Sequence, residues 1–96
     1  MMPCPTQQLG YLLPTRGLLL ADPGAKNADL VLRLGLKAED GGFDSVWVGD
    51  SLTAKPRLEP LSALSAIAAR TNRVRLGPAV LLAALRHPVL LAQTLA

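Results

Sequence analysis

The sequence predicts an α/β fold, a single domain over residues 1–96 built from three consecutive β/α units. Short apolar runs suited to buried strands alternate with longer stretches in which apolar residues recur at helical spacing. Glycine, proline and asparagine stand at most of the junctions. Half of the residues are hydrophobic and 18% are charged, a composition that excludes a disordered chain. Alternation of this kind is typical of parallel strands joined by helical crossovers.

The first unit follows a loose leader, residues 1–8. The apolar run 9–14 is expected to form a strand. A helix is then expected from Asn27, whose side chain can cap a first turn, to the glycines at 41–42, which suit a left-handed stop. Within that helix, Gly35 costs about 1 kcal/mol relative to alanine. A small residue there would let the helix sit close to a sheet.

The second unit consists of a strand at 43–48 and a helix that begins at Pro60, because proline fits the first helical position. This helix is expected to end near residues 70–72, of which Asn72 tolerates the left-handed conformation.

The third unit begins with a strand at 73–76, which is expected to break at Gly77-Pro78 and to resume through 79–82. Proline cannot donate a hydrogen bond within a sheet, so the chain is expected to bulge or bend at this point. His87 and Pro88 open a third helix.

Both an open doubly wound sheet and part of a β/α barrel fit this order of elements. The Gly-x-Gly-x-x-Gly fingerprint of dinucleotide binding and the phosphate-loop signature are absent from the sequence. In a barrel, the residues just past each strand form the active face. Those residues are 14–16, 49–51 and 79–82.

Several residues in or near these strand ends are candidates for a site. Asp50 can accept a hydrogen bond from a ligand or simply form a turn. Arg16 can meet an anion or lie at the surface, and Trp47 is expected in the core rather than stacked on a cofactor. His87 is expected to cap a helix or to lie at the surface. No metal cluster, carboxylate pair or nucleophile–base pair stands out in the sequence.

Charge, cysteine content and hydropathy limit the kinds of partner and the cell compartment that we expect. The net charge is +3, and the basic cluster Arg70, Arg73 and Arg75 has no interleaved aromatics, so a solvated helix end is favoured over a nucleic-acid site. The single cysteine, Cys4, has no disulfide partner, which favours the cytoplasm. The apolar run 79–85 is far shorter than the roughly 20 residues of a membrane span, so none is expected.

The amino-acid sequence of several segments resembles that of the luciferase-like monooxygenase superfamily. The residues that carry the resemblance lie in the three strands and the helices that follow them: 12–16, 42–52, 59–61, 68–77, 79–82 and 86–92.

This resemblance implies a TIM-type (β/α)8 barrel, of which the chain supplies the N-terminal part, about three β/α units. It implies FMN or the deazaflavin coenzyme F-420 as cofactor, for monooxygenation or hydride transfer on a small organic substrate. Asp50, Pro78, Ala79 and Val80 match the cofactor-binding positions, with Ala79-Val80 where the family often has a non-prolyl cis peptide. Ser51 replaces a histidine that serves as a catalytic group in several of these enzymes, so the catalytic residue is not assigned.

A second interpretation belongs to a different class. The chain is then a truncated, non-catalytic α/β fragment that needs further β/α units or a partner chain. Three parallel strands leave unpaired edges, which favours a homo-oligomer or completion by another chain.

Overall fold

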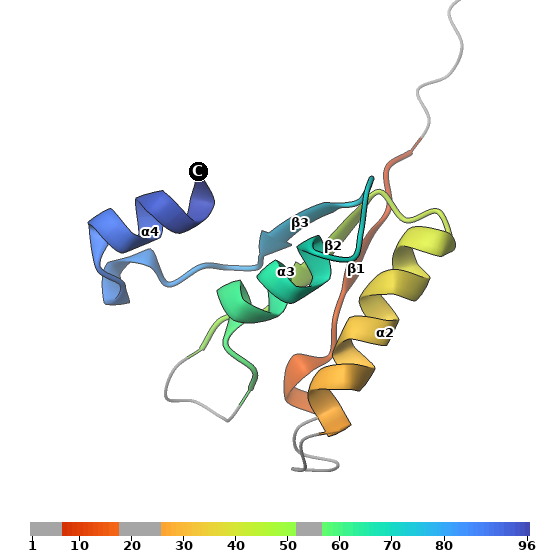
Figure 1. Cartoon of the computed structure of the whole chain (residues 1–96), viewed down its shortest axis with the longest axis horizontal. Helices are drawn as coiled ribbons and strands as arrows, with labels where there is room; N and C mark the ends of the chain where they lie inside the picture. Colours follow the sequence, from red (N-terminus) through yellow and green to blue (C-terminus); the bar gives the residue numbers. More distant parts are fainter. Residues whose placement is uncertain (1–6, 18–25, 52–56) are drawn as a thin grey trace, which may run out of the picture.

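Three parallel strands form the centre of the molecule. The computed structural model describes residues 7–17, 26–51 and 57–96. Strands β1 (Gly10–Leu12), β2 (Ser45–Val48) and β3 (Arg75–Pro78) lie in the order β1-β2-β3 (Figure 1). Both pairings are parallel, as predicted for an α/β fold.

Two helices cover one face of this sheet. Helix α2 (Lys26–Asp40) connects β1 to β2, and α3 (Pro60–Ala68) connects β2 to β3 (Figure 1). A 3-10 turn, η1 (Ala83–Leu85), and helix α4 (Pro88–Leu95) follow β3. The predicted alternation of strands and helices is therefore confirmed. The predicted leader is described only from residue 7, and residues 7 and 8 are exposed without regular secondary structure.

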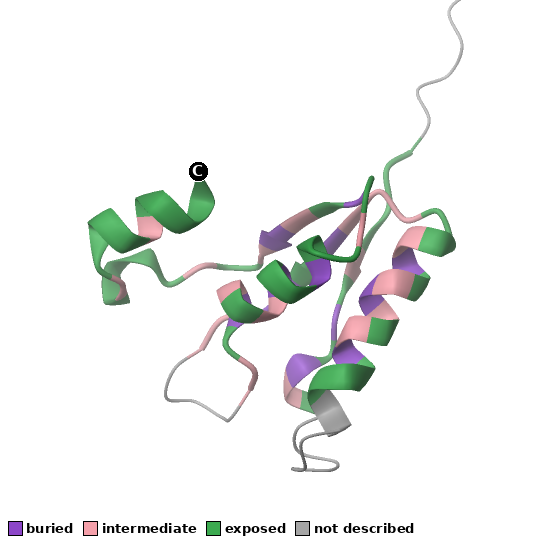
Figure 2. Ribbon diagram, viewed as in Figure 1, coloured by how far each residue is buried: buried purple, intermediate pink, exposed green. Residues whose placement is uncertain are grey.

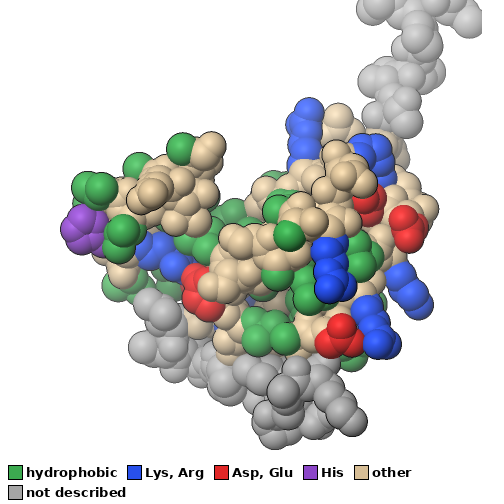
Figure 3. Space-filling view, viewed as in Figure 1, with side chains coloured by type: hydrophobic (Ala, Val, Ile, Leu, Met, Phe, Trp, Pro, Cys, Tyr) green, Lys and Arg blue, Asp and Glu red, His purple; other side chains and the backbone are tan. Residues whose placement is uncertain are grey.

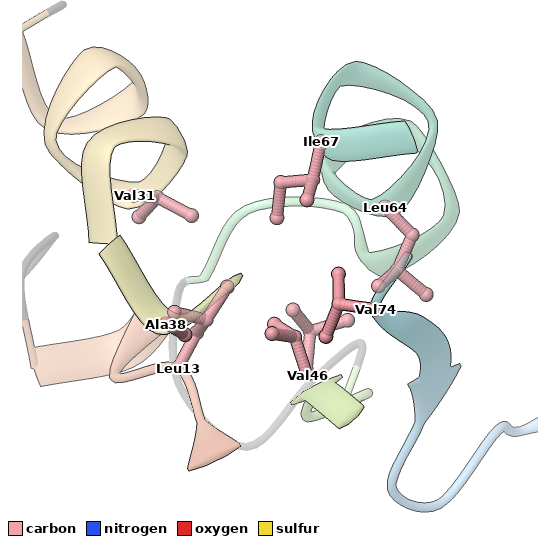
Figure 4. Close-up of a cluster of buried hydrophobic side chains, with 8 residues drawn as sticks. Leu13, Val31, Ala38, Val46, Leu64, Ile67 and Val74 are labelled. Carbon is pink, nitrogen blue, oxygen red and sulfur yellow. The ribbon is translucent and has the colours of Figure 1, made fainter. Parts of the chain in front are cut away.

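The core lies between the sheet and these two helices. Aliphatic side chains from β2, α2 and α3 meet there, and the buried residues line the inner sides of the elements (Figures 2 and 4). Val46, Val48 and Ile67 are 0% exposed. Burying one aliphatic side chain of this size contributes roughly 1.5–3 kcal/mol. The buried cluster consists of Leu13, Val31, Ala38, Val46, Val48, Leu64, Ile67 and Val74.

Helix α2 ends as predicted but begins differently. Gly42 has φ +88°, and the N–H of Phe43 donates to the carbonyl of Ala38 at 3.0 Å, which closes the helix with the expected glycine stop. The prediction that Asn27 caps the helix is wrong, because α2 starts at Lys26 and Asn27 lies inside it. A Cβ at Gly35 would stand 3.2 Å from Ile67 atoms, so this glycine brings α2 close to α3 rather than to a sheet.

The prediction that β3 breaks at Gly77-Pro78 and then resumes is also wrong. The strand runs through Gly77 and ends at Pro78, which pairs with Val48. Backbone N–H groups alternate in direction along a strand, and the N–H of Ala79 donates to Val48 at 2.7 Å. Position 78 therefore faces the outer edge of β3, where a missing N–H costs no ladder bond.

Trp47 lies on the sheet face away from the helices. Its side chain is outside the buried cluster and 39% exposed, so the prediction of a core position is wrong. The indole N–H donates to Ser45 Oγ at 2.8 Å. A Cβ at Gly10 or at Gly77 would stand 2.7 Å or 2.6 Å from the indole, so glycines on both neighbouring strands make room for it.

Candidate functional site

The carboxyl ends of the parallel strands meet around one hollow of about 300 Å³. This is the edge at which parallel α/β folds place their ligands. The lining combines apolar surface with two guanidinium groups. The residues that line it are Leu12, Leu13, Pro14, Thr15, Arg16, Gly17, Gly49, Arg57 and Ala79. The structure therefore brings together residues that follow three different strands, as predicted.

Arg16 and Arg57 supply the positive charge of this hollow. Arg16 lies in a helical turn at 15–17, shortly after β1, and its Nη2 lies 3.3 Å from Ser51 Oγ. Arg57 packs against the backbone of Gly49, where a Cβ would collide with the guanidinium nitrogen Nη1. The Nε atoms of both arginines are buried and make no hydrogen bond to the described residues.

Asp50 directs its carboxylate toward the segment after β3. Its side chain is 1% exposed, and Oδ2 accepts from the N–H of Leu82 at 2.8 Å and from Arg86 Nη2 at 3.0 Å. The other arm of Arg86 donates to Glu59 Oε1 at 2.8 Å. Acidic and basic side chains meet between α3 and the C-terminal segment in Figure 3. Asp50 therefore anchors the chain that leaves β3 to the end of β2.

This network shifts the pKa values of two of its members. The hydrogen bond to Asp50 raises the pKa of Arg86, against the opposing effect of burial, and Glu59 adds to the rise. Burial disfavours the charged form of Glu59. Hydrogen bonds from Ser62 and Arg86 outweigh that penalty and hold the pKa of the carboxyl below its ordinary value. Glu59 and Arg86 are therefore both charged at neutral pH.

A family model described as luciferase-like monooxygenase matches residues 7–96. The chain belongs to the luciferase-like monooxygenase family. At the level of this family the match indicates a luciferase-like oxidoreductase, and it does not favour the non-catalytic fragment. A comparison with the curated proteins gives no match.

In this luciferase-like chain, the dipeptide singled out by resemblance has the conformation that the resemblance implied. The peptide bond between Ala79 and Val80 is cis. Ala79 lines the hollow, while the Val80 side chain is 78% exposed. Pro78 instead faces a groove between α3 and α4, together with Leu64 and Thr94. The structure thus brings only Ala79 of these three residues into the hollow, and Asp50 follows the lining residue Gly49 with its carboxylate bonded to Leu82 and Arg86.

Two other sequence predictions concern residues outside the hollow. His87 caps α4, because its Nδ1 accepts from the N–H of Val89 at 3.3 Å. Asn72 does not adopt the left-handed conformation, since no non-glycine residue in the described ranges has a positive φ. Arg73 donates to the carbonyl oxygen of Glu39 at 2.8 Å, and Arg70 and Arg75 are exposed. On the face shown in Figure 3, basic side chains are interspersed with acidic ones.

Sequence reasoning missed Arg57, Arg86 and Glu59 as parts of this region. Arg57 and Glu59 follow β2 and precede α3, so their place in a loop at the carboxyl edge was a usable signal. Nothing in the chain's local pattern indicates that Arg86 reaches back to Asp50. In the described ranges, no three metal-ligating side chains gather, and no helix there is both long enough and apolar enough to cross a membrane.

Proposed function

We propose that this protein is a flavin-dependent oxidoreductase that uses FMN or the deazaflavin coenzyme F-420 for monooxygenation or hydride transfer on a small organic substrate. The family match over residues 7–96 carries the proposal. We also propose that the three β/α units belong to the N-terminal part of a (β/α)8 barrel, and that the protein works in the cytoplasm. Neither nucleic acid nor membrane is a partner in this proposal.

The residues of the hollow fit a flavin-type ring. Such a ring has an apolar edge and an edge of carbonyl and imino groups. Leu12, Leu13 and Ala79 offer apolar contact to such a ring. When bound, the flavin would supply the redox chemistry, and the protein would supply orientation and a dry pocket.

The site residues have two kinds of role in this proposal: some shape the seat of the flavin ring, and others form hydrogen bonds to a ligand. Ala79 and Val80 shape the seat of the ring, and Pro78 ends β3 so that the chain turns there. Asp50 is assigned a hydrogen bond to the cofactor or its substrate; its place directly after β2 supports this role, while its carboxylate also accepts from Leu82 and Arg86. Ser51 provides a hydroxyl beside Arg16, so this chain orients a ligand there with a neutral group.

The test is a titration of the protein with FMN and with the deazaflavin. Flavin absorption overlaps tryptophan emission, and the chain has a single tryptophan, Trp47, on the uncovered sheet face. Binding at micromolar concentration, seen as quenching of Trp47 and a shift of the visible spectrum, is the expected result. Asp50→Asn should weaken binding by about tenfold, since a charge-assisted hydrogen bond contributes roughly 1.5–3 kcal/mol.

Glu39→Gln is the matched control for this experiment. Glu39 is also a carboxylate that accepts from backbone N–H groups, but those belong to residues 72–74, before β3 and not after it. The Glu39→Gln variant should bind flavin as the unchanged protein does. Absence of flavin binding by the unchanged protein, or equal losses in both variants, would overturn the proposal. Far-UV circular dichroism checks that each variant keeps its fold.

A further inference from the structure

The two arginines of the hollow share an unusual environment. Arg16 and Arg57 both line it and both are partly buried. The ion pairs among the described residues involve Arg33 and Arg86 only, so neither arginine of the hollow has a carboxylate partner there. Among the described residues, Arg16 donates to the neutral hydroxyl of Ser51, at the long distance of 3.3 Å.

Two acidic residues close in the sequence to Gly49 and Arg57 are already engaged. Asp50 is next to Gly49 in the sequence and Glu59 is two residues after Arg57. Both carboxylates accept hydrogen bonds from Arg86. Glu59 additionally accepts from the N–H of Ser62 at 2.6 Å as the cap of α3. The positive charge of Arg16 and Arg57 is therefore not compensated by these carboxylates. No carboxylate of the described residues pairs with these partly buried cations, and such an arrangement favours the binding of an anion.

The backbone at Gly49 lets one of these guanidinium groups approach closely. A Cβ at this position would collide with Nη1 of Arg57 and would stand 3.1 Å from Cζ. A side chain with a Cβ at position 49 would displace the Arg57 guanidinium, and both residues line the hollow. Guanidinium groups present several N–H donors in a planar fork that matches carboxylate and phosphate oxygens.

We propose that the hollow binds an oxyanion, the carboxylate or phosphate group of a small-molecule ligand, between Arg16 and Arg57 beside the backbone at Gly49. Resting on the proposed function, this group belongs to the organic substrate or to the cofactor. The apolar part of the lining, Leu12 and Ala79, contacts the uncharged part of the same ligand. The site thus selects anionic small molecules.

The test uses inorganic phosphate and acetate as probes, with sodium chloride at equal ionic strength as reference. Isothermal titration calorimetry should detect saturable binding of phosphate or acetate to the unchanged protein. Arg16→Gln and Arg57→Gln should each weaken it by about tenfold. Arg33→Gln is the matched control, because Arg33 pairs with Asp29 on the exposed side of α2, and it should bind the anion unchanged.

A second variant keeps the proposal testable if Arg57→Gln does not fold. Gly49→Ala retains both arginines but forces the Arg57 guanidinium from its place, and it should also weaken the anion by about tenfold. Anion effects no larger than those of chloride would overturn the proposal. An equal loss in Arg33→Gln would overturn it as well, because it would show general charge screening.

Comparison of FMN with riboflavin, which lacks the phosphate, distinguishes the two sources of the anion. If the arginine variants weaken FMN but not riboflavin, the site holds the cofactor phosphate. If the arginine variants bind both flavins as the unchanged protein does but no longer bind phosphate or acetate, the site holds the anionic group of the substrate. Absence of flavin binding with intact anion binding contradicts the proposed function alone, so the two proposals fail separately.

Discussion

At the scale of single residues, the indole of Trp47 decides which side chains its neighbours can have. It lies across the uncovered face of the sheet, against Gly10 on β1 and Gly77 on β3, and its N–H is satisfied by Ser45. A large aromatic side chain can cover backbone in this way only when the adjoining positions carry no Cβ. The two glycines are therefore packing partners of one tryptophan.

Gly77→Ala tests this packing. The new Cβ would stand 2.6 Å from Trp47 Cζ3, so the indole must move toward solvent. We expect a loss of about 1–3 kcal/mol in unfolding free energy, as for other overpacked sites. We also expect a red shift of the tryptophan emission. Urea unfolding and fluorescence spectra measure both effects.

Gly17→Ala is the control for that substitution. A Cβ at Gly17 would stand 3.9 Å from Pro14 Cβ, an ordinary contact. This variant should leave the emission of Trp47 unchanged. A Gly77→Ala protein with unaltered emission would show that the indole does not depend on the space at position 77.

At the scale of elements, Glu39 joins the end of α2 to the start of β3. Its carboxylate accepts from the N–H groups of Asn72, Arg73 and Val74 at 3.0, 2.8 and 2.9 Å. These bonds satisfy the turn that follows α3. They hold the pKa of the Glu39 carboxyl below its ordinary value, Val74 and Arg73 having the largest effects. The turn between α3 and β3 is thus attached to an element that lies far from it in the sequence.

The pH dependence of stability follows from this lowered pKa. A carboxyl whose pKa is lower in the folded state stabilises the fold above its unfolded pKa, about 4.3, and this contribution is lost as the pH falls through the folded pKa. Glu39→Gln should therefore lower the midpoint of urea unfolding at neutral pH. The difference from the unchanged protein should shrink progressively below about pH 4.

Asp40→Asn provides the comparison for Glu39→Gln. Asp40 is the next residue and is exposed, and the described part of the chain shows no hydrogen bond to its carboxylate. Its substitution should leave the urea midpoint nearly unchanged at neutral pH. Equal midpoints for Glu39→Gln and the unchanged protein at neutral pH would contradict the role assigned to Glu39.

At the scale of the whole molecule, apolar surface lies open in two places. The sheet face away from α2 and α3 presents Leu12, 61% exposed, beside Trp47. Helix α4 has no buried residue and presents Val89 and Leu90, 67% and 62% exposed (Figure 2). Exposed apolar surface of this kind marks sites of association. We propose that a second copy of this chain covers the open sheet face.

Leu12→Lys tests that proposal. Sedimentation velocity of the unchanged protein should show a mass that rises with concentration, because burying apolar surface favours association. Lysine at position 12 places a charge on the open sheet face and should shift the protein toward monomer. Gln7→Lys adds the same charge at an exposed residue before β1, and this variant should not shift the protein toward monomer. A constant monomer mass at all concentrations would contradict the proposal.

The sequence by itself determined the parallel α/β organisation and the glycine stop of α2. It also predicted the cap at His87 and the meeting of three strand ends. These features depend on local chemistry and on the rule that parallel strands end at one edge. Only the tertiary structure decided that Trp47 leaves the core and that β3 runs through Gly77. It also showed that Asp50 reaches Leu82 and Arg86, because these outcomes depend on contacts between residues far apart in the chain.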